Sequence, residues 1–138
     1  MSSSAASSKQ FWRSINQLTL YSGASYFVAM ATAHFFGLKY PLLFVYYDTP
    51  FHAYQDKIIA FCVAVYVALF VNATQSRAVV PTAVASMWIT TIGLSLVNVS
   101  DDLAKVLKPG QTTTAYWLQT AVVGAITAVL TVSYFKSK

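Results

Sequence analysis

The residues of this chain that could hold a metal or a cofactor are few, and most of them stand close together in the sequence. The 138 residues include no glutamate, four aspartates, two histidines and one cysteine. Asp48, His52 and Asp56 fall within nine residues of one another, and His34 lies shortly before them. Imidazole and carboxylate groups together can bind a divalent metal, and one imidazole can be the axial ligand of a haem.

This cluster supports two related hypotheses about a bound group. A metal ion would be held by His52, Asp56 and Asp48. A haem or a chlorin would instead use His34 or His52 as its ligand. Polar side chains also collect at the ends of membrane spans because water is found there, so the pattern fits a solvated rim as well. No longer motif decides between these readings, since HExxH needs a glutamate and neither a Gly-rich phosphate loop nor GxSxG occurs.

The composition of the chain indicates an integral membrane protein. Hydrophobic residues make up 57% and charged residues 9%, whereas soluble domains carry about 25% charged residues. A helix needs roughly 20 apolar residues to cross the hydrocarbon, and four blocks approach that length: 18–37, 50–73, 79–99 and 116–135. We therefore expect a single all-α domain, a bundle of four transmembrane helices with both termini on the same side. Residues 1–10 are polar and of low complexity, which predicts disorder.

The connection between the first two expected helices is apolar and aromatic. Its core, LLFVYY at 42–47, is too short to span a bilayer, so we expect residues 40–50 to lie in the interface or to form a re-entrant turn. Asp48-Thr49-Pro50 is typical of a helix start. Antiparallel helices would then bring His34, His52, Asp56 and the pair Asp101-Asp102 to one rim of the bundle.

Small residues recur at a helical spacing. Four of them repeat every fourth position along the first expected helix, and two glycines lie within the later ones: Ser25, Ala29, Ala33, Gly37, Gly93 and Gly124. In a membrane such positions let helix backbones approach closely, because no hydrophobic effect drives helices together there. The sequence therefore predicts that these residues form helix-packing faces.

The charge pattern favours lipid and protein partners over nucleic acid. The net charge is +5, but the basic residues stand at span ends, where anionic headgroups would meet them. No charged residue falls in the middle of an expected span, so the usual sign of ion coupling is missing. The single cysteine, Cys62, excludes an internal disulfide.

These observations lead to one expected function and two alternatives. We expect a multi-pass integral membrane protein that acts as an accessory or assembly subunit, packing against other membrane proteins as a hetero- or homo-oligomer and catalysing no reaction alone. The first alternative is a metal-, haem- or pigment-binding membrane protein that uses His34 or His52. The second is a small enzyme or carrier that handles a lipid or a quinone.

Overall fold

The chain folds into five α-helices and one short 3-10 turn. The computed structural model describes residues 2–50 and 52–138, and no strand occurs in that part of the chain. The elements in chain order are α1 (Ser2–Phe36), α2 (Ala53–Gln75), η1 (Arg77–Val79), α3 (Val80–Asn98), α4 (Asp101–Val106) and α5 (Thr114–Lys136). The all-helical class predicted from the sequence is confirmed, and the bounds of α2, α3 and α5 fall within three residues of the expected ones.

The first helix is much longer than the sequence predicted. It begins at Ser2, where disorder was expected over residues 1–10, and it runs on without a break into the apolar block. Neither proline nor glycine interrupts it before Gly23, and its serine, alanine and lysine residues tolerate a helix. The helix ends at Phe36 because Gly37 adopts a positive φ of 67° and the Leu38 N–H bonds back to the Ala33 carbonyl, 2.8 Å away.

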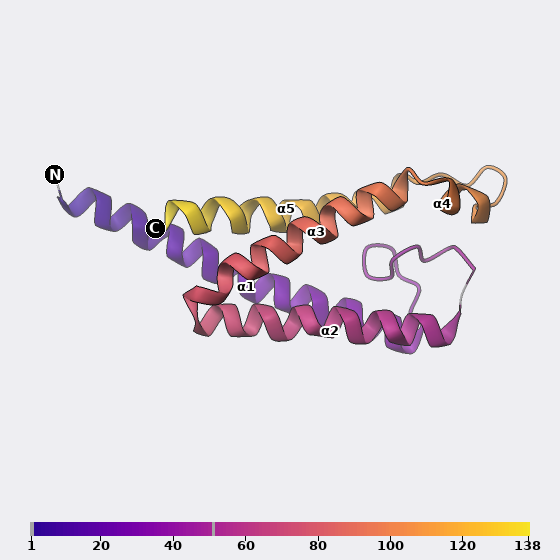
Figure 1. Ribbon diagram of the computed structural model, residues 1–138, viewed down its shortest axis with the longest axis horizontal. Coiled ribbons are helices and arrows are strands. Elements are labelled where there is room, and N and C mark those ends of the chain that lie inside the picture. Colours follow the sequence, from indigo (N-terminus) through magenta and orange to yellow (C-terminus); the bar gives the residue numbers. More distant parts are fainter. Residues whose placement is uncertain (1, 51) are drawn as a thin grey trace.

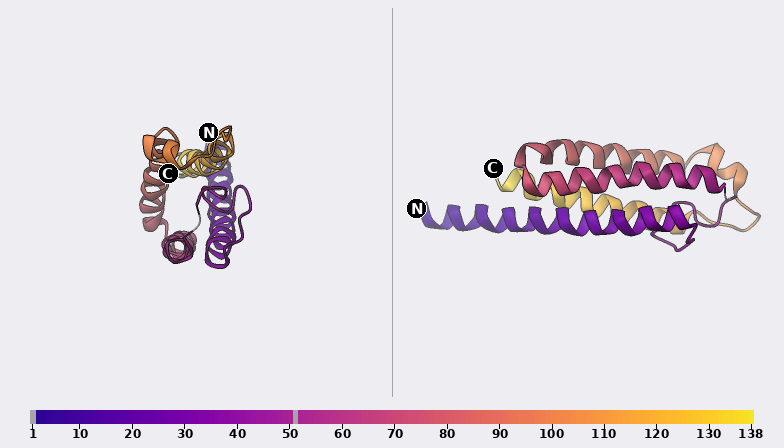
Figure 2. Two further views of the ribbon diagram at one scale, coloured as in Figure 1. Left: turned by 90° about the vertical axis from the view of Figure 1, so that its right-hand side faces the viewer. Right: turned by 90° about the horizontal axis from the view of Figure 1, so that it is seen from below.

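The four long helices form a closed ring of neighbours. Helix α1 packs against α2 and α5, while α3 packs against α5 and α2. Seen along the bundle, the helices surround a common axis (Figure 2, left). The two ends of the chain lie at the same end of this bundle, and the connection between α1 and α2 lies at the other (Figure 1).

Three stretches of the described residues are long and apolar enough to cross a membrane: Ala53–Gln75, Arg77–Asn98 and Thr114–Lys136. The fourth expected span, within α1, is long enough but more polar, since Thr19, Ser22 and Ser25 interrupt its apolar residues. Large apolar side chains cover the outer surface of all these helices, among them Leu18, Phe61, Val65, Ile89 and Leu118. Such a surface is stable in lipid and not in water, so the chain is a membrane protein.

Helices α2 and α3 are close at one end only. They are joined through η1, and they diverge from that turn towards the far end of the bundle (Figure 1). Midway along both helices the Tyr66 hydroxyl of α2 still hydrogen-bonds the Thr90 hydroxyl of α3. Further along, residues 37–50 of the connection lie at the end of the bundle where α2 and α3 have diverged (Figure 1). The fold therefore places the polar stretch of the sequence at the end where α2 and α3 are farthest apart.

Candidate functional site

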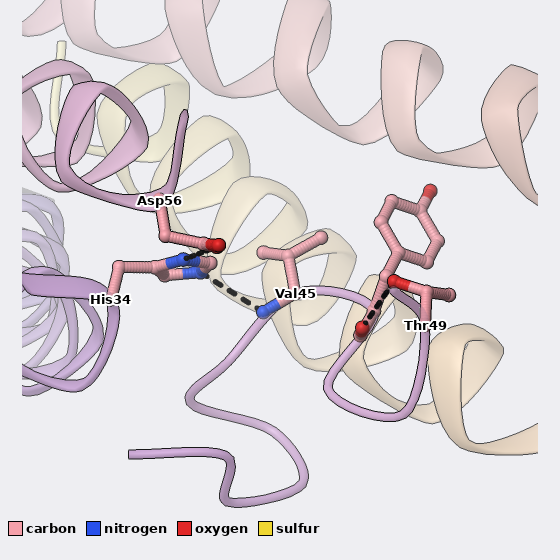
Figure 3. Close-up of polar contacts among 5 residues, drawn as sticks. His34, Val45, Thr49 and Asp56 are labelled. Atoms are coloured by element: carbon pink, nitrogen blue, oxygen red, sulfur yellow. Dashed lines mark hydrogen bonds and ion pairs between the residues drawn. The ribbon is translucent and has the colours of Figure 1, made fainter. Parts of the chain in front are cut away.

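His34 and Asp56 form a buried pair at the open end of the bundle. His34 is in the last turn of α1 and Asp56 in the first turn of α2. The Nδ1 atom of His34 lies 3.1 Å from the Asp56 Oδ1 atom (Figure 3). The side chain of His34 is wholly buried, and that of Asp56 is 11% exposed. The antiparallel packing of α1 and α2 brings these two residues together from 22 positions apart.

The second ring nitrogen of His34 fixes its protonation state. The backbone N–H of Val45 donates to the His34 Nε2 atom over 3.0 Å, so Nε2 carries no proton. The proton of the neutral imidazole is then on Nδ1, and Nδ1–H donates to Asp56. The Phe44 ring stacks on the imidazole with centroids 4.2 Å apart. With both nitrogens engaged, His34 has no free lone pair for a metal or a haem iron.

The connection between α1 and α2, called the segment below (residues 37–50), has a strained backbone at two positions. Leu42 and Tyr46 adopt positive φ angles of 73° and 54°, which cost a residue other than glycine about 1 kcal/mol or more each. Both carbonyl groups are held in place. That of Leu42 accepts from the Tyr26 hydroxyl at 2.6 Å and the Gln119 amide at 3.1 Å, and that of Tyr46 accepts from the Thr49 hydroxyl at 2.8 Å (Figure 3). Two helices, α1 and α5, and the segment itself thus hold these two carbonyl groups.

Tyr46 ties the segment to α3. Its hydroxyl donates to the Asn98 side-chain oxygen at 3.1 Å, and the Asn98 amide donates to the Thr120 hydroxyl of α5 at 2.9 Å. Burial raises the pKa of Tyr46 to about 12, so the phenol stays protonated and remains a donor at neutral pH. The hydrogen bonds from Tyr46 to Asn98 and from Asn98 to Thr120 therefore connect the segment to α3 and, through α3, to α5.

Asp48, one of the expected metal ligands, has a different partner. The Tyr116 hydroxyl of α5 donates a hydrogen bond to the Asp48 Oδ1 atom. The Gln111 amide donates to the same tyrosine oxygen at 3.0 Å. Asp48 thus fastens the end of the segment to α5, and neither His52 nor Asp56 shares in that bond.

An apolar cavity of about 250 Å³ lies between the four long helices, on the side of the segment that faces into the bundle. Val45 and Tyr46 form its upper wall, and the other lining residues come from all four helices: Phe27, Met30, Ile59, Val63, Tyr66, Thr90, Leu94 and Val123. Its walls are almost wholly hydrocarbon and aromatic ring. An apolar cavity of about 150 Å³ is known to stay dry and to bind a benzene-sized molecule, so this one has room for an apolar ligand.

A second chamber of about 150 Å³ adjoins the first, and we call it the polar chamber because polar as well as apolar side chains line it. The two share Val45, Tyr46 and Ile59. The chamber is also lined by Thr49, His52, Gln55 and Asp56, of which His52 and Gln55 are exposed at the surface. The site is therefore amphipathic, with a dry compartment inside the bundle and a polar compartment at its rim.

The expected rim of ionisable residues is only partly formed. His52 is exposed because α2 begins at Ala53, so His52 stands in extended backbone outside the helix face on which it was expected. Asp101 and Asp102 are exposed on α4, where Asp102 pairs with Lys105 at 3.0 Å. In the described part of the chain no three His, Cys, Asp or Glu side chains gather closely enough to hold a metal ion.

The residues expected to pack helices have varied positions. Ala33 is buried, Ala29 and Gly37 are half-buried, and Ser25 is exposed. A Cβ at Gly124 would lie 3.5 Å from Thr91 of α3, an ordinary contact, whereas one at Gly93 would meet no atom within 4 Å. Gly23, which the spacing did not single out, is more crowded than Gly93 or Gly124. A Cβ there would lie 2.4 Å from the Phe70 ring.

Several residues of the site gave no signal in the sequence. The Val45 N–H is a backbone group, and nothing in a sequence marks which amide will meet a histidine. Gln119, Asn98 and Tyr116 are separated from their partners in the segment by 77, 52 and 68 positions. Only the polarity of Asn98 and Gln119 in otherwise apolar helices could have suggested that each has a buried partner.

Comparison with known proteins gives no further guide to this site, because no family model, no curated protein and no solved structure matches the chain.

Proposed function

We propose that this chain is a membrane protein that binds one single-chain amphiphile, the carrier form of the lipid- or quinone-handling function considered above. The observation that carries this proposal is the pair of adjoining compartments, both lined by Val45 and Tyr46 of the connection between α1 and α2. An apolar cavity beside a chamber that holds polar side chains matches a molecule with a hydrocarbon chain and a compact headgroup. In a bilayer every such molecule is already concentrated around the helices.

We propose binding and not catalysis because the polar side chains of the site are already engaged in structural hydrogen bonds. His34, Tyr46 and Asp48 are each engaged in holding the strained segment. A catalytic base or acid must instead reach the proton that it transfers. We therefore propose that the segment roofs the site and that its hydrogen bonds preserve the shape of the cavity.

The proposal includes α1 as a fourth membrane span with both termini on one side. This follows the packing of α1 along α2 over most of its apolar half, and the shared position of the chain ends (Figure 1). Single cysteines at Ser7, Ser76 and Lys108 in a Cys62→Ser background test this topology with a membrane-impermeant thiol reagent. Ser7 and Ser76 should react from one side and Lys108 from the other. Reaction of all three from the same side would contradict four spans.

The binding site can be tested with a photoactivatable analogue of decanol in phosphatidylcholine nanodiscs. Illumination should attach the analogue to the cavity walls, on peptides that carry Val63 and Leu94. Val63→Phe fills the cavity and should lower this labelling about tenfold, equivalent to about 1.4 kcal/mol of binding free energy. Its matched control is Val65→Phe, because Val65 is on the same helix but 65% exposed to lipid.

The control variant should label like the unmodified protein. Labelling spread evenly over Val65 and the other lipid-facing residues, and unchanged by Val63→Phe, would contradict a site in the cavity. It would show only that the analogue dissolves in the surrounding bilayer.

A second candidate function, the accessory or assembly subunit, is favoured by the start of α1. This part of the helix runs past the C-terminal end of α5 (Figure 1). Its contact with the rest of the chain there is a hydrogen bond from the Lys9 ammonium to the Lys138 carbonyl at 2.9 Å, and Phe11 is 58% exposed. A partner protein could cover this projecting stretch. Purification for the labelling experiment tests both functions, since a subunit would co-migrate with larger membrane proteins in mild detergent.

A further inference from the structure

One oxygen of the Asp56 carboxylate accepts a hydrogen bond from His34, and the other can accept one from a bound molecule. Asp56 as a whole is 8% exposed, and His34 is the hydrogen-bond partner of its carboxylate within residues 2–50 and 52–138. That bond uses Oδ1. The side chain also lines the polar chamber, so Oδ2 is the acceptor that a molecule in the chamber would meet. A buried carboxylate gains from a second donor, because hydrogen bonds to a charged group are worth about 1.5–3 kcal/mol.

The partner of Asp56 leaves its negative charge in place. His34 is neutral, as its bond from the Val45 N–H requires, so the pair as a whole is anionic. No lysine or arginine lies within ion-pair distance of Asp56 in the described part of the chain. Of the other polar residues that line the chamber, Thr49 already donates its hydroxyl proton to the Tyr46 carbonyl, and Gln55 and His52 are exposed, whereas Asp56 is buried. The chamber therefore favours a hydrogen-bond donor and repels an anion.

Taking the proposed function as its basis, we infer that the site selects an amphiphile whose headgroup donates a hydrogen bond to Asp56 and carries no negative charge. An alcohol and an amine share this chemistry. An amphiphile with the same hydrocarbon tail and a carboxylate headgroup meets neither condition. It has no proton to donate, and its negative charge would lie beside that of Asp56 with little water to screen the repulsion. The apolar cavity sets the kind of tail, and the Asp56 oxygen sets the kind of headgroup.

Competition against the photoactivatable decanol analogue tests this selection. Decanol, decylamine and decanoate are added at about pH 9, well above the pKa of a carboxylic acid, and each amount is corrected for its measured partition into the bilayer. Decanol and decylamine should reduce the labelling of the cavity. Decanoate should need a concentration at least about tenfold higher to do the same.

Two variants of equal charge change locate the selection at Asp56. Asp56→Asn keeps an acceptor oxygen for His34 but removes the charge. In this variant decanoate should compete as well as decanol and decylamine do. Asp101→Asn makes the same change on α4, where the side chain is exposed, and should leave the preference of the unmodified protein intact.

The outcomes separate this inference from the function on which it rests. Equal competition by decanol and decanoate in the unmodified protein would overturn the headgroup selection while the cavity remained a binding site. A preference that survives Asp56→Asn would overturn it too. Absence of labelling in the cavity, with or without competitor, would instead overturn the proposed function itself.

Discussion

Replacing His34 by alanine is expected to lower the free energy of unfolding by about 3–5 kcal/mol. The substitution removes the hydrogen bond that the neutral imidazole donates to the Asp56 carboxylate, and a hydrogen bond to a charged group is worth about 1.5–3 kcal/mol. It also leaves the Val45 N–H without its acceptor and removes the ring on which Phe44 stacks. Unfolding in mixed micelles, titrated with a denaturing detergent and followed by circular dichroism, measures the change.

His52→Ala is the matched control for this measurement. It deletes the same side chain 18 positions later, in a residue that is exposed and precedes α2, so stability should change by less than about 0.5 kcal/mol. Asp56→Asn, which retains an oxygen for the His34 N–H, should cost less than His34→Ala. If the two histidine variants were equally stable, the pair would have no structural role.

The His34→Ala substitution should affect the segment first and the four long helices only later. With His34 gone, one α1 side chain whose hydrogen bond to the segment remains is Tyr26, which bonds the carbonyl of Leu42, one of the two residues with a positive φ. Strained residues of this kind persist only where their surroundings fix them. The roof of the cavity would therefore loosen before the helices separate, and binding of the decanol analogue should weaken at detergent concentrations where the helix content is unchanged.

How far the sequence predicted this site depends on the range of the contacts. The end of the first apolar block and the start of the second were expected to be neighbours, because consecutive spans connected by a short segment run antiparallel. That argument places His34 near Asp56 and is sound. It also placed His52 there, but His52 precedes the helix and so does not share its face. Whether His52 belongs to the site therefore depends on where α2 begins, and the helix begins one residue after it.

The contacts that shape the connection were beyond prediction. Residues 40–50 were expected to associate with the membrane, and this stays a prediction; Phe44 is buried within the protein itself. The left-handed conformations of Leu42 and Tyr46 have no sequence signature, since such positions normally call for glycine or asparagine. Their cost is offset by Tyr26, Gln119 and Thr49, two of which are distant in sequence. Local propensity is overruled here by tertiary hydrogen bonds.

Helix packing shows the same limit at Gly23. The four-residue repeat of Ser25, Ala29, Ala33 and Gly37 predicted a packing face on α1, and of these four residues only Ala33 is buried. The point of closest approach depends on the rotation of α2 about its own axis, and therefore on the position of Phe70. A periodic pattern identifies a face of one helix, but it says nothing of where a large side chain of the next helix will lie.

Gly23→Ala is accordingly expected to destabilise the protein by about 2 kcal/mol, within the usual cost of overpacking a core. The added Cβ would stand 2.4 Å and 2.8 Å from two carbons of the Phe70 ring. The ring has little room to withdraw, because Phe70 is fully buried and packs edge-on against Phe27 with centroids 5.4 Å apart. The same detergent titration measures the effect.

Gly93→Ala is the control, because it makes the same chemical change in helix α3. No atom lies within 4 Å of its new Cβ, so only the helix-propensity gain remains and stability should rise by about 0.5–1 kcal/mol. The two alanines should thus change stability in opposite directions. Phe70→Leu should cost less in the Gly23→Ala background than alone, since the smaller side chain relieves the contact. Strict additivity of these two substitutions would show that Gly23 and Phe70 do not meet.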